Sequence, residues 1–249
     1  MHKHGAIRKR PVNAAQTGRA TPVGVPRTTR PVRVLISAGP TYEPIDAVRF
    51  IGNRSSGAMG IAIADEAAAR GAECTLLLGP TSLSTTSTTV NVKRFRTTAD
   101  LQALLAEEFP HCDVLIMAAA VADYRVRLPR SRRTAKISRN KKGLTLRLEA
   151  TPDLVAQVAR LRRPSQVIVG FALEPRHSMR SRAAAKLARK GLDLIVANPL
   201  ETMESGSIQA TVLSSEGTVL EQRTPVSKAA FARKLIGLLL KRSRAATLT

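Results

Sequence analysis

Ser55, Ser56 and Gly57 stand directly before an Ala-rich run of helical composition, where they could bind a phosphate group. The N-terminus of a helix binds anions, because its unpaired backbone N–H groups and the positive end of its dipole face the ligand. Serine hydroxyls at this point could instead only cap the helix. The spacing alone therefore indicates either a phosphate site or an ordinary helix start.

Arg49 and Asn53 lie just before this turn and add a guanidinium and a carboxamide. A guanidinium can hold a carboxylate or a phosphate through two hydrogen bonds, and a carboxamide can donate and accept at once. Surface arginines are usually only solvated, so Arg49 alone is weak evidence. The segment is neither a dinucleotide-binding fingerprint nor a P-loop, because G-x-G-x-x-G and G-K-S/T are both absent.

Three further places could contact a nucleotide. Small residues follow Met117 up to Asp123, so a planar ligand could approach the backbone there. The Asp123 carboxylate could accept hydrogen bonds from a ribose or a base. Asp123 could instead be a capping or loop residue. Lys136 lies in a basic stretch, residues 124–143, and could close over a triphosphate, although such charge runs are more often solvated. Lys186 and Lys190 share a helix face, where like charges repel unless an anion lies between them.

The elements that must position these loops alternate between short strands and helices. Val114–Ala120 is a continuous apolar run, typical of a parallel strand buried on both faces. Other strands are expected at Val32–Ser37, Cys74–Leu78, Val92–Phe95, Leu144–Leu148, Gln166–Phe171 and Leu192–Ala197, with a hairpin of Ile208–Leu213 and Thr218–Leu220. Helices are expected at Met59–Arg70, from Thr98, from Thr151, at Ser178–Lys190, and from Thr224 to about Arg242.

This alternation predicts an α/β fold, namely a doubly wound, Rossmann-like, mostly parallel sheet with helices on both faces and a small hairpin and flap extension. Ligands of such sheets bind at the carboxyl ends of the strands, near the point where the strand order reverses. The loops that follow Ser37, Ala120 and Phe171 are therefore the places for chemistry.

The composition is strongly basic, with 40 Lys and Arg against 18 Asp and Glu, which favours polyanionic ligands. Residues 1–31 contain no acid and four prolines, which predicts a disordered basic tail before a folded domain at 32–249. Two cysteines exclude a disulfide framework, and no metal site is expected from the Cys and His spacing. No apolar run is long enough to cross a membrane, so we expect a cytoplasmic protein without membrane contact.

Several blocks together resemble the phosphopantothenate–cysteine ligase family, the synthetase half of the bifunctional bacterial coenzyme A biosynthesis flavoprotein. The resemblance covers about residues 32–242. It depends on the blocks SAGPTYEPIDAVRFIGNRSSGAMG at 37–60, AAVADY at 119–124, KI at 136–137, TPDLV at 151–155, VGFA at 169–172 and KGLDLIVAN at 190–198.

The resemblance implies a ligase that activates the carboxylate of 4′-phosphopantothenate with CTP and Mg²⁺. An acyl-cytidylate forms with release of pyrophosphate, and the L-cysteine amine then displaces CMP. It also implies a homodimer in which the flap of one subunit helps to complete the site of the other. Since nothing before Val32 could form the flavin-binding half, we expect no flavin, and a separate phosphopantothenoylcysteine decarboxylase could act on the product.

The resemblance also implies residue roles. Asn53, Lys136 and Arg49 match catalytic positions. The positions that match nucleotide binding are Ser55, Ser56, Gly57, Met117, Ala118, Ala119, Asp123, Lys136, Pro152, Asp153, Leu154, Val155, Phe171, Lys186 and Lys190. Three departures concern charge or shape: Ala58 stands where the family has Lys, KISR at 136–139 replaces K-I-K-K, and GFALEP at 170–175 replaces G-F-A-A-E-T.

Two other classes of function compete with this one. A nonspecific nucleic-acid-binding protein on a degenerate Rossmann-like scaffold would explain the net charge of +22, but two Tyr, five Phe and no Trp leave few stacking platforms. A nicotinamide oxidoreductase is disfavoured because its glycine fingerprint is absent.

Overall fold

The structure is a computed structural model that describes residues 1–2, 30–127, 135–139, 141, 143–203 and 205–246. The chain divides into two units, Met1–Arg30 and Pro31–Thr249, and the fold is that of the second. The predicted disordered tail falls largely on residues 3–29, and part of the predicted flap falls on residues 128–134, 140 and 142. These residues lie outside the described part of the chain.

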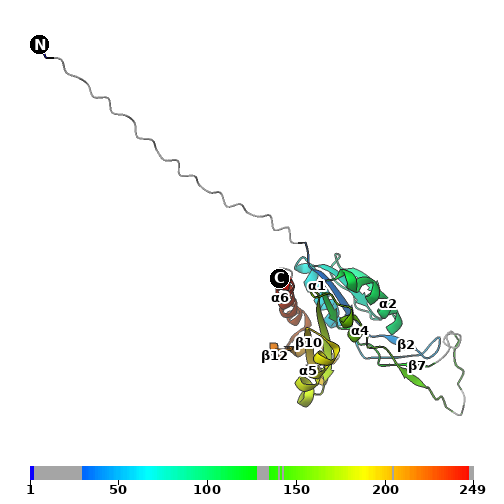
Figure 1. The fold of residues 1–249 in the computed structure, drawn as a ribbon. Helices are drawn as coiled ribbons and strands as arrows, with labels where there is room; N and C mark the ends of the chain where they lie inside the picture. The colour runs from blue at the N-terminus through cyan, green and yellow to red at the C-terminus, as the bar shows by residue number, and fades with distance from the viewer. Residues whose placement is uncertain (3–29, 128–134, 140, 142, 204, 247–249) are drawn as a thin grey trace. The chain divides into compact units, whose positions relative to one another are not determined.

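One mixed sheet forms the centre of the second unit (Figure 1), and in the described part of the chain it has eight strands in the order β12–β11–β10–β9–β6–β1–β4–β5. The parallel strands are β5 (Asn91–Arg94), β4 (Glu73–Leu78), β1 (Arg33–Ala38), β6 (Val114–Met117), β9 (Val167–Glu174) and β10 (Leu194–Pro199). The strands β11 (Ser207–Ser214) and β12 (Gly217–Ser227) continue the sheet antiparallel beyond β10.

Counted in chain order, the parallel strands lie as 3-2-1-4-5-6, which is the order of the dinucleotide-binding fold. Connections leave β1 toward β4 and leave β6 toward β9, so the order reverses between β1 and β6. The predicted doubly wound, mostly parallel α/β fold is confirmed.

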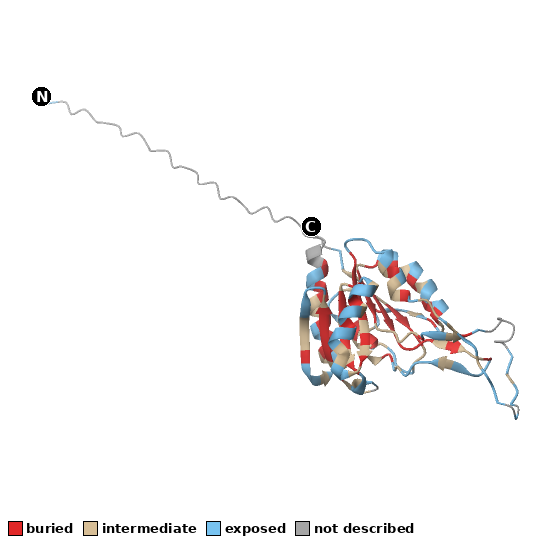
Figure 2. Ribbon diagram, turned by 60° about the horizontal axis from the view of Figure 1, so that its bottom comes forward, coloured by how far each residue is buried: buried red, intermediate tan, exposed pale blue. Residues whose placement is uncertain are grey.

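Helices cover both faces of the sheet because side chains along each strand alternate between two cores. On β1, Val34 and Ile36 pack with α1 (Ala58–Ala69) and α6 (Lys228–Ala246), whereas Leu35 faces the other core. That second core includes α2 (Thr98–Glu108), α4 (Leu154–Arg160) and α5 (Met179–Lys190). Figure 2 shows the buried residues gathered in the strands and on the inward sides of the helices. Short 3-10 turns lie at Phe109–His111, Arg176–Ser178 and Leu200–Thr202.

Two small antiparallel pairs extend beyond the sheet. The pair β2 (Tyr42–Pro44) and β3 (Phe50–Gly52) occupies the segment predicted as a loop after β1. The pair β7 (Tyr124–Val126) and β8 (Leu148–Ala150) frames the predicted flap. The strands β2 and β7 lie side by side and point away from the sheet (Figure 1), so the hairpin and the flap begin from one place.

Some predicted strand boundaries are wrong. The strand expected at Val114–Ala120 ends at Met117, and Ala120 instead forms an isolated bridge with Pro40 of the first loop. The strand expected at Leu144–Leu148 runs from Leu148 to Ala150, where it pairs with β7. Local apolar runs therefore marked these strands only approximately, because the partner strand determines which residues pair.

The predicted helix starts also shift by a few residues. Thr97, not Thr98, caps α2, because its hydroxyl accepts from the Asp100 amide at 3.1 Å while the Asp100 carboxylate accepts from the Thr97 amide at 2.8 Å. Asp153 caps α4, and Thr151 instead donates to the Ala122 carbonyl oxygen at 2.5 Å. The last helix begins at Lys228 rather than at Thr224, because β12 continues to Ser227.

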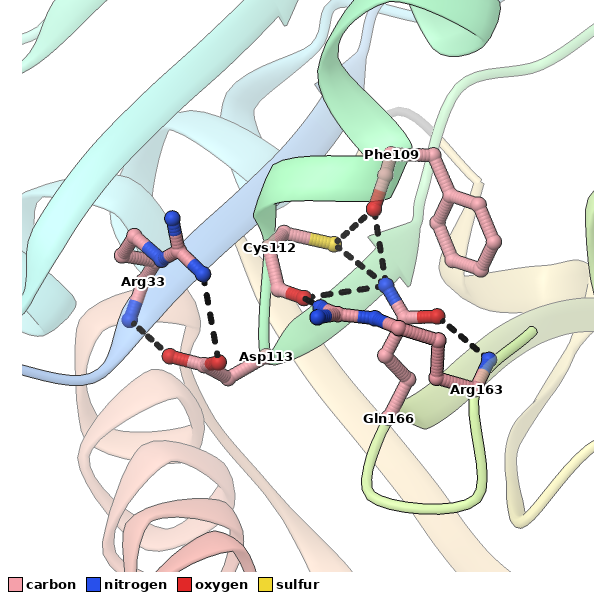
Figure 3. A network of polar contacts seen from close by, with 6 residues as sticks. All are labelled: Arg33, Phe109, Cys112, Asp113, Arg163 and Gln166. Atoms are coloured by element: carbon pink, nitrogen blue, oxygen red, sulfur yellow. Dashed lines mark hydrogen bonds and ion pairs between the residues drawn. The ribbon is translucent and has the colours of Figure 1, made fainter.

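A polar network fixes the amino ends of the central strands (Figure 3). The buried Gln166 amide donates to the carbonyl oxygens of Phe109 at 2.7 Å and Cys112 at 2.9 Å. Asp113 accepts from the Arg33 backbone amide at 2.8 Å. These bonds tie the starts of β1, β6 and β9 together, so that the opposite, carboxyl ends of the same strands lie in register.

Helix α1 packs unusually close to β1 because of one glycine. A Cβ built on Gly60 would lie 2.4 Å from the Cβ of Ala38, far inside a normal contact. The absence of a side chain at residue 60 therefore sets the distance between the helix and the strand, and with it the position of the helix N-terminus.

We expect Gly60→Ala to lower the free energy of unfolding by about 1–3 kcal/mol, because overpacking at this contact must push α1 from β1. Urea denaturation monitored by circular dichroism measures this. Gly206→Ala is the matched control, since a Cβ there meets nothing within 4 Å. Equal stability of the two variants would contradict the close-packing argument.

Candidate active site

The loops that follow β1 and β6 meet at the point where the strand order reverses. The Ala120 amide donates to the Gly39 carbonyl oxygen at 2.9 Å, and the Thr41 amide donates to the Ala120 carbonyl oxygen at 3.2 Å. These bonds extend the β1–β6 pairing into the loops. The crevice expected in this fold therefore opens beside residues 39–41 and 118–123.

Three glycines take the roles of the dinucleotide-binding fingerprint without its sequence. Gly39 turns directly after β1 with a φ of +82°, and Gly57 has a φ of +74° at the N-cap of α1. A Cβ on Gly57 would lie 3.2 Å from the Gly39 nitrogen, so the two backbones touch. With Gly60 against β1, these residues supply the tight turn, the close backbone approach and the helix–strand packing. Sequence reasoning named Gly57 in a phosphate-binding turn but did not assign these roles to Gly39 and Gly60, because residues 40–56 separate the first glycine from the other two.

The alternative that Ser55 or Ser56 caps α1 is wrong, because Gly57 is the N-cap and makes no side-chain cap hydrogen bond. The two hydroxyls accept only long contacts of 3.4 Å, from the amides of Gly57 and Ala58. Thr81 steadies the turn by donating to the Ser56 carbonyl oxygen at 2.8 Å. The two hydroxyls and the first-turn amides of α1 therefore face the same opening.

A first cavity of about 300 Å³ lies over the ends of β6 and β9. It gathers most of the residues predicted to bind the nucleotide, and the apolar residues Leu192 and Ile195 also line it. The predicted residues that line it are Met117, Ala119, Asp123, Pro152, Asp153, Leu154, Val155, Phe171, Lys186 and Lys190. Apolar side chains together with charged groups suit a base and ribose followed by phosphates.

The two lysines of this cavity each have a carboxylate partner. The Lys186 ammonium lies 2.5 Å from the buried Glu174 carboxylate, and the Lys190 ammonium lies 3.0 Å from Asp153. The repulsion expected between the two lysines is therefore already balanced within the protein. A bound polyphosphate would share these lysines with Glu174 and Asp153.

A second cavity of about 220 Å³ lies on the α1 side of the same strand ends. Ser55, Ser56, Gly57 and Ala118, also predicted to bind the nucleotide, line this cavity and not the first. The two cavities share Ala119, Ala120 and Phe171. The structure thus divides most of the predicted nucleotide-binding residues between two neighbouring cavities.

Asn53 follows β3 and contacts a residue that lines the first cavity. Its exposed side-chain amide donates to the Val121 carbonyl oxygen at 2.9 Å, and Val121 lines the first cavity. Asn53 therefore lies beside the backbone that both loops share, next to the residues common to the two cavities.

Arg49 is held by a carboxylate of the protein itself. The buried Asp46 carboxylate accepts from the Arg49 guanidinium at 2.8 Å, from the amides of Val48 and Arg49 at 2.8 and 2.7 Å, and from the Ile137 amide at 3.2 Å. The Arg49 guanidinium also donates to the Ile137 carbonyl oxygen at 3.4 Å. Asp46 was not among the predicted site residues. Aspartate side chains often accept hydrogen bonds from backbone amides two or three residues later in a turn, and this preference could have indicated Asp46.

These bonds tether the flap to the hairpin. Ile137 follows Lys136 directly, so Asp46 fixes the backbone beside this lysine while the Lys136 side chain remains exposed. Hydrogen bonds from the backbone amides, that of Val48 first, hold the pKa of Asp46 below its ordinary value, and the Arg49 charge acts in the same direction. The carboxylate is therefore fully charged at neutral pH.

Neither cysteine is available as a nucleophile. Burial raises the pKa of the Cys74 and Cys112 thiols to about 12, so both stay protonated and enclosed. Within the described ranges, no group of three or more His, Cys, Asp or Glu could hold a metal ion, and no helix there is long and apolar enough to span a membrane.

We expect Asp46→Asn to free the flap, because the amide cannot accept all of the bonds that the carboxylate accepts. Trypsin should then cleave after Lys136 several-fold faster, measured by mass spectrometry of the peptides. Asp65→Asn is the control, since Asp65 holds a different loop at Thr86. Equal cleavage in both variants would contradict the tether.

The pH dependence of the tether follows from the lowered pKa of Asp46. The pKa of this carboxyl group is lower in the folded protein than in the unfolded chain, where it is about 3.9. The carboxylate therefore stabilises the fold above the unfolded pKa. This stabilisation is lost as the pH falls through the folded pKa. The Ile137 amide resonance should therefore stay constant from about pH 7 to 5 and move only below about pH 4. A midpoint between pH 5 and 7 would contradict this assignment.

Comparisons with known proteins identify the family. The family model described as "DNA/pantothenate metabolism flavoprotein C-terminal domain" matches residues 30–242. The chain is 46% identical over 174 residues to a cysteine/cysteine sulfinic acid decarboxylase from an unknown prokaryotic organism, a match that covers 70% of this chain and 47% of that protein. It is 41% identical over 198 residues to the coenzyme A biosynthesis bifunctional protein CoaBC of Mycobacterium tuberculosis, covering 75% of this chain and 47% of that protein.

Among solved structures, the C-terminal domain of a coenzyme A biosynthesis bifunctional protein CoaBC is similar with a TM-score of 0.70 and 32% identity. That match covers 84% of this chain and 93% of the other. The chain spans about half the length of the two curated relatives above, and their names describe those whole proteins. By the extent of the family match, the chain belongs to the family of the DNA/pantothenate metabolism flavoprotein C-terminal domain.

Proposed function

We propose that the chain is a phosphopantothenate–cysteine ligase of coenzyme A biosynthesis, with residues 32–249 as its ligase domain. It would join 4′-phosphopantothenate to L-cysteine through an acyl-cytidylate formed from CTP. The observation that supports this most is the first cavity, where segments far apart in the sequence, from Met117 to Lys190, come together at the strand ends. Relatives named for coenzyme A biosynthesis support the same pathway.

In the first step, a carboxylate oxygen of the acid attacks the α-phosphorus of CTP. A phosphorus–oxygen bond forms, the bond to the β-phosphate breaks, and pyrophosphate leaves. Catalysis of this step requires alignment of the two substrates and neutralisation of phosphate charge. Lys186 and Lys190 at the rim of the cavity, and Lys136 on the tethered flap, would provide cations, and Mg²⁺ would enter bound chiefly to phosphate oxygens.

In the second step, the cysteine amine attacks the acyl carbon and CMP leaves with the bonding electron pair. Asn53 would act here, because its side-chain amide donates to the carbonyl oxygen of Val121, which follows Ala120, a residue that lines both cavities. The donor now bonded to Val121 could instead hold the acyl oxygen as negative charge develops on it. A neutral amide can do this, whereas a carboxylate would repel the charge.

The proposal also covers the location of the protein, its oligomeric state and its other partners. The ligase would work in the cytoplasm as a homodimer without flavin, and a separate decarboxylase could use its product. Nonspecific nucleic-acid binding through residues 1–31 would be a distinct property, and it should weaken steeply as salt rises.

We expect pyrophosphate release that requires 4′-phosphopantothenate, L-cysteine and a nucleoside triphosphate together, with CTP preferred. A coupled pyrophosphate assay with CTP, ATP, GTP and UTP measures this, and reactions that lack one substrate are the controls. Absence of release with all four nucleotides would end the proposal.

We expect Asn53→Asp to block the second step, so that the acyl-cytidylate builds up while turnover falls by about 100-fold or more. Rapid-quench mass spectrometry measures the intermediate, and steady-state product formation measures turnover. Asn91→Asp makes the same change at an exposed position of β5 and should leave both unchanged. Normal turnover by Asn53→Asp would refute the role of Asn53.

A further inference from the structure

Glu174 is a buried carboxylate beside the first cavity. It is the last residue of β9, and its side chain is only 5% exposed. Because side chains alternate along a strand, Glu174 points to the same face as Ile168 and Ala172, which belong to the core beneath α5. A charged group in such surroundings is costly unless cations lie against it.

Two cations of α5 lie against this carboxylate. Arg182 and Lys186 are four residues apart and therefore share a face of the helix. The Lys186 ammonium lies 2.5 Å from one carboxylate oxygen of Glu174, and the Arg182 guanidinium lies 3.7 Å from the other. Of these two cations, Lys186 lines the first cavity. Glu174 therefore holds an ammonium that belongs to the space proposed for CTP.

The second lysine of the cavity has a different kind of partner. Asp153, which lies against Lys190, is 45% exposed, so water can solvate its charge when a phosphate binds the lysine. Glu174 is buried, and a phosphate that draws Lys186 away deprives this carboxylate of its nearest cation. Phosphate and Glu174 therefore compete for one ammonium, at a cost that the exposed pair does not impose.

We propose that Glu174 is a positioning residue that limits how tightly the first cavity holds polyphosphate, so that pyrophosphate can leave after the first step. This inference rests on the proposed ligase function and adds a residue that acts through Lys186. Tight binding of CTP and pyrophosphate alike gives no acceleration of the chemical step, whereas slow product release lowers turnover. A competing carboxylate weakens both complexes while it keeps the ammonium in place.

Glu174→Gln tests this competition, because the amide has nearly the same shape as the carboxylate and no charge. The inhibition constant of pyrophosphate and the KM for CTP should each fall about 3- to 30-fold, the range expected for one charge in partly exposed surroundings. A variant with merely disturbed packing would instead bind both more weakly. Glu221→Gln is the matched control, because Glu221 pairs with Arg180 of the same helix and is not among the residues that line the first cavity.

A double-mutant cycle tests whether Glu174 acts through Lys186. In the background of Lys186→Gln, Glu174→Gln should change the inhibition constant of pyrophosphate much less than in the wild-type background, because the contested ammonium is gone. The double variant should bind pyrophosphate within about 3-fold of the wild-type protein, because a lysine that Glu174 already holds contributes little net attraction.

The double variant also keeps the test valid if Glu174→Gln alone does not fold. Removing a buried ion pair as a whole disturbs a fold less than removing one partner. A raised or unchanged inhibition constant in folded Glu174→Gln, equal changes in the two backgrounds, or a large loss of pyrophosphate affinity in the double variant would overturn the proposal and leave the ligase function intact. A wild-type protein that releases no pyrophosphate from any nucleotide would overturn both.

Discussion

The contact between α1 and β1 is the constraint on which the site depends. Because Gly60 has no side chain, the helix lies directly on Ala38, and Gly57 can then touch Gly39 at the end of the strand. This places the helix N-terminus at the switch point between β1 and β6, with one cavity on each side of the shared loop. A wider separation would move the serine turn away from Ala118 and Ala119, which line the second cavity together with it.

Charge is arranged unevenly around this centre. The chain carries a net charge of +22, yet the lysines of the first cavity and Arg49 are held by the carboxylates of Glu174, Asp153 and Asp46. Such pairs keep long side chains in place and moderate the local field. The second cavity differs, because Arg54 and Lys228 line it and no Asp or Glu is among its described lining residues.

The sheet could be predicted from the sequence because the positions of its strands and helices follow from local hydrophobic patterns. Apolar runs such as the one from Val114 marked buried strands, and alternating helices fixed the parallel order. The hairpin of β2 and β3 was missed because strands of three residues have no measurable period. Asp46 was missed for a different reason: its carboxylate accepts from the Ile137 amide, and only the folded chain brings these two residues together. The predicted site residues themselves stay predictions, although most of them line the two cavities.

The buried thiols have a consequence for a protein that would handle free cysteine. Disulfide exchange requires an accessible thiolate, and its rate falls with the thiolate fraction. Cys74 and Cys112 are enclosed and protonated, with pKa values of about 12, so cystine formed from the amino acid could not readily link to the protein. An oxidising change in the surroundings would therefore lower the supply of free cysteine without modifying these two side chains of the protein.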